Sequence, residues 1–102
     1  MQLKKDTKLY VQIDYPVEGK EFDPQIYEEA VTFANAMAKE RYCKLGVFTN
    51  EHGAMGIFEA ENLEEAHALA QNGPLIKHGL YRYELYEWQL VIASEDAVSA
   101  LK

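Results

Sequence analysis

The sequence predicts one α+β domain in which four strands and two main helices follow the order β-α-β-β-α-β. Three observations predict it: an alternating run near the amino terminus, two apolar-striped segments with helix-start signals, and an aromatic strand near the carboxy terminus. With 102 residues, 48% of them hydrophobic, the chain can bury a core without disulfides or metal. We expect a single domain over residues 1–102, with a core at 8–92 and a terminal helix at 94–102.

The first strand and the first helix are predicted from residues 9–42. Polar and apolar residues alternate from 9 to 15, so one strand face is apolar and the other carries Tyr10, Gln12 and Asp14. Asp23 and Pro24 then form a helix start, with an N-cap and a proline in the first turn. Apolar residues recur at spacings of three and four, which indicates a long amphipathic helix ending near residue 41 or 42.

A hairpin and a second helix are expected next. Two β-rich runs at 44–49 and 54–60 flank a four-residue turn at 50–53, and each run contains a glycine. Asn62 is a suitable N-cap with Glu65 three residues later, and Gly73 with Pro74 supplies the stop. Residues 74–79 are expected to form a linker into the last strand.

The run "LYRYELYEW" at 80–88 predicts a strand that is apolar on both faces. Tyr81 and Tyr83 share one face, whereas Tyr86 and Trp88 share the other. Two helices cover only one face of a four-stranded sheet, so we expect a second copy of the chain to cover the other. Two alternatives stay open: the terminal helix folds back over this face, or the tyrosines form an exposed ligand platform. The pattern does not decide which set faces the helices.

Composition excludes several classes of partner. The formal net charge of −7 argues against nucleic acid, which requires clusters of Lys and Arg. No stretch has the roughly 18 apolar residues of a membrane span, and the amino terminus lacks a signal-peptide core, so a cytoplasmic location is expected. A lone Cys43 fits a reducing compartment and is interpreted as a small buried hydrophobe.

The element order and the runs "GIFEAENLEEAHALAQNGPL" and "GPLIKHGLYRYELYEW" resemble the dimeric α+β barrel superfamily over roughly residues 8–92. The resemblance is in particular to YCII-related and muconolactone isomerase-like proteins. The resemblance implies ferredoxin-like protomers, each an antiparallel four-stranded sheet with two helices on one face. It also implies a homodimer or higher homo-oligomer with sheets packed face to face, and a pocket between sheet and helices.

The chain departs from the YCII-related pattern at two places. Those proteins usually carry a histidine early in the first helix and an aspartate just before the proline that follows the second. In this chain, Ile26 or Tyr27 stands at the position of the histidine, and Gly73 stands at the position of the aspartate. Pro74-Leu75 is closer to the muconolactone isomerase-like pattern.

The three histidines, His52, His67 and His78, show no metal-ligand spacing, so no metal or cofactor is expected. His78 is the preferred catalytic histidine because it precedes a strand and can reach a pocket rim. His52 is interpreted as a solvated turn residue, and His67 as lying at the edge of the core.

Tyr10 and Tyr27 complete the predicted site with His78, and Cys43 and His52 are expected to lie outside it. Asp14 is a further carboxylate that, beside a phenol, could move a proton, although an ordinary surface acid is the stronger interpretation.

Two functions follow from these residues. The first is an oligomeric domain that binds a small hydrophobic ligand or organic acid without catalysis. The alternative is a cofactor-free isomerase or lyase-type enzyme that moves a proton on a lactone or cyclic acid. A pocket with two or more ionisable side chains would favour catalysis.

Overall fold

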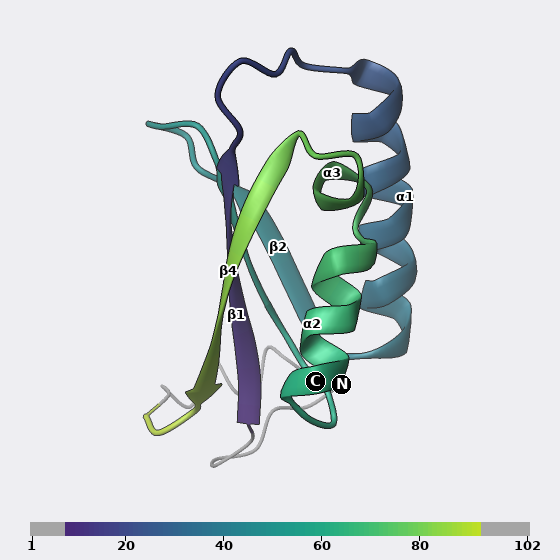
Figure 1. The fold of residues 1–102 in the computed structure, drawn as a ribbon. Helices are drawn as coiled ribbons and strands as arrows, with labels where there is room; N and C mark the ends of the chain where they lie inside the picture. Colours follow the sequence, from purple (N-terminus) through teal and green to yellow (C-terminus); the bar gives the residue numbers. More distant parts are fainter. Residues whose placement is uncertain (1–7, 93–102) are drawn as a thin grey trace.

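The computed structural model describes residues 8–92 and contains a four-stranded sheet with all helices on one face (Figure 1). The strands are β1 (Lys8–Pro16), β2 (Cys43–Val47), β3 (Ala54–Phe58) and β4 (Tyr81–Gln89), and the helices are α1 (Pro24–Glu40), α2 (Leu63–Asn72) and α3 (Pro74–Lys77). The strand order is β2-β3-β1-β4, and every neighbouring pair is antiparallel. The predicted ferredoxin-like α+β fold is confirmed.

Side-chain caps set the starts of both long helices. The Asp23 carboxylate accepts hydrogen bonds from the backbone N–H groups of Gln25 and Ile26, at 3.0 and 3.2 Å. The Asn62 side chain accepts one from the N–H of Glu65 at 2.8 Å. These contacts satisfy backbone donors that the first helical turn leaves without partners. Both helices therefore begin where the sequence predicts.

Two connections differ from the prediction. Residues 74–77 form the short helix α3 and not an extended linker, because Pro74 occupies a first-turn position where its missing N–H costs nothing. The hairpin loop covers residues 48–53, two more than predicted, and is closed by a 3.1 Å hydrogen bond from the N–H of Phe48 to the carbonyl of Gly53. The predicted helix at 94–102 lies outside the described residues.

Strand register decides which residues face the helices. Tyr10 pairs with Phe58, and Asp14 pairs with Tyr83. Residues paired across strands lie on the same face, so Tyr81, Tyr83 and Leu85 face the helices together with Tyr10 and Asp14. The question that the aromatic strand left open is thereby settled: the Tyr81 set points toward the helices.

The main core lies under α2 and the carboxy-terminal end of α1. Tyr10 and Phe58 are 1% and 0% exposed, with ring centroids 6.3 Å apart. Met37 of α1 and Ala66 of α2 complete this cluster. Close packing of large rings against a small helical residue holds α2 and the sheet together.

The second face of the sheet is covered by none of the described helices (Figure 1). Tyr86 is 50% exposed and Trp88 is 42% exposed. A smaller buried cluster around Leu9 and Leu90 closes one end of this face. At the other end, the guanidinium of Arg82 lies 4.3 Å from the centre of a tyrosine ring.

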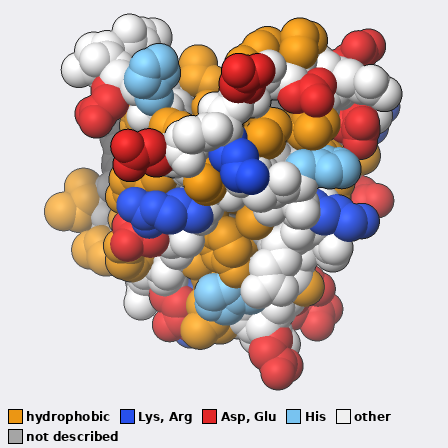
Figure 2. All heavy atoms as spheres, turned by 45° about the horizontal axis from the view of Figure 1, so that its top comes forward, with side chains coloured by type: hydrophobic (Ala, Val, Ile, Leu, Met, Phe, Trp, Pro, Cys, Tyr) orange, Lys and Arg blue, Asp and Glu red, His pale blue; other side chains and the backbone are white. Residues whose placement is uncertain are grey.

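Figure 2 is tilted from the view of Figure 1 so that its top, where α3 leads into β4, comes forward. Hydrophobic side chains are exposed there between acidic groups and a few separated Lys and Arg side chains. In the part of the chain that the structure describes, no helix is long and apolar enough to span a membrane.

Candidate functional site

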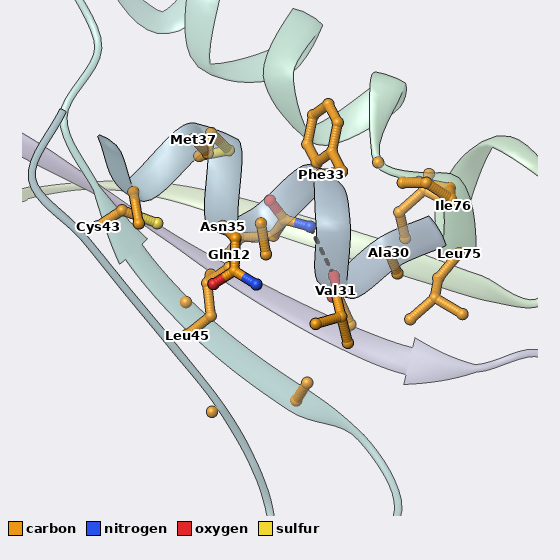
Figure 3. Close-up of a pocket in the computed structure, with 18 of the residues that line it drawn as sticks. Gln12, Ala30, Val31, Phe33, Asn35, Met37, Cys43, Leu45, Leu75 and Ile76 are labelled. Atoms are coloured by element: carbon orange, nitrogen blue, oxygen red, sulfur yellow. Dashed lines mark hydrogen bonds between the residues drawn. The ribbon is translucent and has the colours of Figure 1, made fainter. Parts of the chain in front are cut away.

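A pocket of about 380 Å³ lies between α1 and the sheet, with α3 at one end. We call it the α1 pocket (Figure 3). Most of its walls are apolar side chains, including Val31, Phe33, Leu45, Leu75 and Ile76. It is partly open to solvent, and its volume falls within the roughly 300–1,000 Å³ of typical small-molecule sites.

The pocket exists because side chains on β3 become small along the strand. The face of β3 that points toward the helices carries three residues. From the carboxy-terminal end of the strand to its amino-terminal end they are Phe58, Gly56 and Ala54. A Cβ at Gly56 would collide with the Leu45 side chain, so the absent side chain is what lets Leu45 lie across the strand. The ring of Phe58 therefore fills the space above one end of β3. The small residues Gly56 and Ala54 leave the space above the other end open.

Asp14 places a carboxylate in this mainly apolar pocket. It comes from β1, two residues beyond Gln12 on the same face, and both side chains line the pocket. Gln12 Nε2 donates a 2.8 Å hydrogen bond to Asp14 Oδ1, which is drawn as the dashed line in Figure 3. Burial raises the pKa of the Asp14 carboxyl, and the bond from Gln12 opposes part of this rise.

Two further ionisable side chains line the same pocket. Tyr27 projects from the first turn of α1 and is half-exposed, with its ring 5.7 Å from that of Phe22. Cys43, at the start of β2, is half-buried, and burial raises its thiol pKa. A thiol of raised pKa stays protonated and is a poor nucleophile.

The three predicted site residues do not line one pocket together. Tyr27 lines the α1 pocket, whereas Tyr10 is fully buried in the neighbouring core. His78 follows α3 on the surface, with its Nε2 3.9 Å from Glu29 Oε1. Cys43 does line the pocket, so the expectation that it would lie outside is wrong for this cavity. A catalytic role for Tyr10, Tyr27 and His78 stays a prediction.

Asp14 is the site residue that sequence reasoning ranked too low. The alternation in β1 had already placed it on one face with Tyr10 and Gln12. A carboxylate on the same strand face as a core aromatic was the available signal, because that face packs against helices and not against water.

His67 takes part in a separate polar cluster between α2 and β4. Its Nδ1 lies 2.8 Å from the Tyr83 hydroxyl, which also accepts a 3.1 Å hydrogen bond from Gln71 Nε2. The prediction of an edge-of-core position fits this contact. Among residues 8–92, no three His, Cys, Asp or Glu side chains are grouped closely enough to hold a metal ion.

Comparison with solved structures supports the fold. The chain is similar to 5-chloro-2-hydroxyhydroquinone dehydrochlorinase (TftG) from Burkholderia phenoliruptrix AC1100, solved in complex with 2,5-dihydroxybenzoquinone. The TM-score is 0.59 at 20% sequence identity, covering 79% of this chain and 93% of that one. No family model and no curated protein matches the sequence. The two chains therefore share a fold over most of their lengths, which agrees with the ferredoxin-like fold that the resemblance implied.

Two of the residues named for the departures from the YCII-related pattern line the pocket. Tyr27, one of the two candidates for the first position, lines it, as does Gly73, whereas Ile26 does not. The carboxylate of this pocket comes instead from Asp14 on β1, at another point of the wall.

Proposed function

We propose that the chain binds a small, largely apolar organic molecule in the α1 pocket and that Asp14 holds its polar group. One observation carries this proposal: a half-buried carboxylate, oriented by Gln12, stands in a pocket of about 380 Å³ with mainly apolar walls. Ligand sites commonly combine an apolar lining with a few positioned polar groups.

The nature of the ligand is limited by the walls. Phe33 and the aliphatic side chains of α1 and α3 suit the face of a ring, and the volume admits one or two fused rings. The dehydrochlorinase of similar fold acts on a hydroxylated, chlorinated ring, which is consistent with a cyclic ligand.

Calorimetric titration with 2-naphthol tests the proposal. This probe offers a bicyclic apolar body and one hydroxyl group. We expect saturable binding to the wild-type chain that is lost in Ala54→Leu, because a larger side chain at this lining position fills the cavity. Glu18→Gln, at an exposed loop residue, is the matched control and should bind as wild type does. Equal binding to the wild type and Ala54→Leu would place the ligand elsewhere.

A second candidate function is cofactor-free proton transfer in the same pocket. The supporting observation is that burial raises the pKa of Asp14, which brings this carboxyl closer to the range useful for a general acid or base. Tyr27 supplies a phenol at the same pocket. An isomerase or lyase-type reaction on a small cyclic carbonyl compound needs only these groups.

Hydrogen–deuterium exchange in 2-tetralone would test catalysis. This bicyclic ketone has weakly acidic protons beside its carbonyl, and nuclear magnetic resonance follows their replacement in heavy water. Catalysis predicts exchange above the buffer rate that Asp14→Asn abolishes and Glu18→Gln leaves unchanged. Exchange at the buffer rate with bound ketone would leave ligand binding as the function.

The second sheet face is our proposed surface for self-association. Tyr86 and Trp88 stand half-exposed on it, next to the partly buried Val11 and Ile13 of the central strand. Two such aromatics can bury on the order of 300 Å², and a stable interface needs roughly 800 Å² per partner. A homodimer with its sheets face to face uses the whole surface.

Sedimentation at micromolar concentration tests the dimer. The wild type should sediment as a species twice the 11.7 kDa chain mass. Replacing Tyr86 and Trp88 by Ser should give a folded monomer, whereas replacing Tyr81 and Tyr83 should mainly unfold the protomer, since that pair faces the helices. A wild-type monomer would mean that this face is covered from within the chain or left as a platform.

A further inference from the structure

We infer that the α1 pocket selects neutral ligands that carry a hydroxyl donor and rejects the corresponding carboxylates. This inference rests on the proposed binding function. It keeps small hydrophobic molecules as ligands and excludes organic acids. It follows from the charge and hydrogen-bonding capacity of the groups that line the pocket.

The described side chains that line the pocket include an acidic group but no basic group. Asp14 is the one acidic side chain among the described residues that line it, and none of them is Lys, Arg or His. The remaining polar side chains include the amides of Gln12 and Asn35 and the phenol of Tyr27. A carboxylate entering this space would meet a like charge with no cation against it, which is unfavourable where water is partly excluded.

Two basic side chains near the pocket, Arg41 and His78, contact acidic side chains outside it. Arg41, just after α1, lies 3.1 Å from Glu65 and donates to the backbone carbonyl of Glu59 at 3.3 Å. His78 faces Glu29 at 3.9 Å on the surface. Neither side chain lines the pocket.

The Asp14 carboxylate can accept further hydrogen bonds from a ligand. An ionised carboxyl group only accepts hydrogen bonds and has about four acceptor positions. Within residues 8–92, Gln12 supplies one hydrogen bond to Oδ1, which leaves capacity for a ligand hydroxyl. A hydroxyl complements this group, whereas an ether or a second carboxylate does not. Hydrogen bonds to charged groups are also stronger than those between neutral groups.

Three probes with the same ring system separate these contributions: 2-naphthol, 2-methoxynaphthalene and 2-naphthoate. At pH 7 the wild type should bind 2-naphthol most tightly. The methyl ether should bind roughly 10- to 100-fold more weakly, because it cannot donate to Asp14. The carboxylate should bind weakest, because it adds charge repulsion.

Asp14→Asn reverses the preference if the inference is correct. The asparagine keeps an oxygen for Gln12 and removes the negative charge, so 2-naphthol should bind more weakly and 2-naphthoate more tightly than to the wild type. Glu18→Gln removes a charge from an exposed loop and should change neither affinity.

The outcomes separate the two proposals. If no probe binds the α1 pocket, the proposed binding function fails. If all three bind there with similar affinity, or if Asp14→Asn leaves the 2-naphthol to 2-naphthoate ratio unchanged, binding stands and the selectivity inference is overturned. A wild-type preference for 2-naphthoate would also overturn it.

Discussion

The space between the helices and the sheet is filled at one end and hollow at the other, although the same strands floor both ends. Around Tyr10 and Phe58, side chains are fully buried under α2. Four residues farther along the same strand faces, around Asp14 and Ala54, lies the α1 pocket. The backbone register continues unbroken between the two ends.

This difference teaches that the pocket is a property of side-chain size, not of a change in fold. The step from Phe58 to Gly56 and Ala54 on one strand removes the volume that a ring would have filled. The step from Tyr10 to Asp14 on the neighbouring strand places a charge beside the resulting space. A ferredoxin-like fold can thus form its core and its site from adjacent rows of one sheet.

The largest effect is expected in the filled end. Phe58→Ala removes a ring that is 0% exposed and leaves a cavity against Tyr10, so unfolding free energy should fall by about 3–5 kcal/mol. Urea denaturation followed by circular dichroism measures this change. A loss below about 1 kcal/mol would mean that the core rearranges to fill the space.

The comparison is sharpest when one substitution is made at both ends. Ala66→Leu adds volume to a helix position that is 0% exposed, so it should cost about 1–3 kcal/mol through overpacking. Ala54→Leu adds the same volume at the pocket wall, where space is free, and should cost less than about 1 kcal/mol. Urea midpoints of the two variants give the answer, and equal losses would contradict the distinction between a filled and a hollow end.

The smallest effect on the unfolding free energy is expected for Asp14→Asn, and it is a gain in stability where the other substitutions cause a loss. Because burial raises its folded-state pKa above the ordinary 3.8, the native state binds its proton more tightly than the unfolded state does. The stability that the folded state gains from this tighter proton binding is fully present below pH 3.8, and it is lost as the pH rises through the folded-state pKa. Asp14→Asn should therefore be at least as stable as the wild type at neutral pH.

Thermal unfolding between pH 3 and pH 8 follows this difference. The stability advantage of Asp14→Asn should grow with pH and then level off, whereas Glu18→Gln should show no such trend. A variant that matches the wild type at pH 3 but is less stable at neutral pH would mean that Asp14 serves the fold through its charge. Stability gained together with binding lost is the pattern expected of a functional residue.

Much of the fold could be predicted because local signals agree with it. Helix caps at Asp23 and Asn62, a broad apolar stripe and period-two strands all indicate the same element order. Helix α3 was missed because four residues are too few to show helical periodicity. The face assignment of β4 could not be predicted, since it depends on pairing with β1 and not on the strand's own pattern.

The candidate site was predicted less well. Of the three residues predicted for the site, Tyr27 lines the α1 pocket, whereas Tyr10 belongs to the core and His78 to the surface. The pocket depends on how Phe58, Gly56 and Ala54 line up with β1 and β2, which is a contact between distant parts of the chain. Single-sequence patterns describe periodicity along one segment and carry no information on volume between segments.

Strand β2 gives the pocket a wall that differs in its dynamics from the rest. It is five residues long and is an edge strand of the sheet, hydrogen-bonded to β3 alone among the described strands. Edge strands open locally at lower free energy than central strands, so amide hydrogens of β2 should exchange with solvent sooner than those of β1. Leu45 and Val47 therefore line the pocket from an edge of the sheet, and local opening of this strand would widen the pocket without displacement of α1.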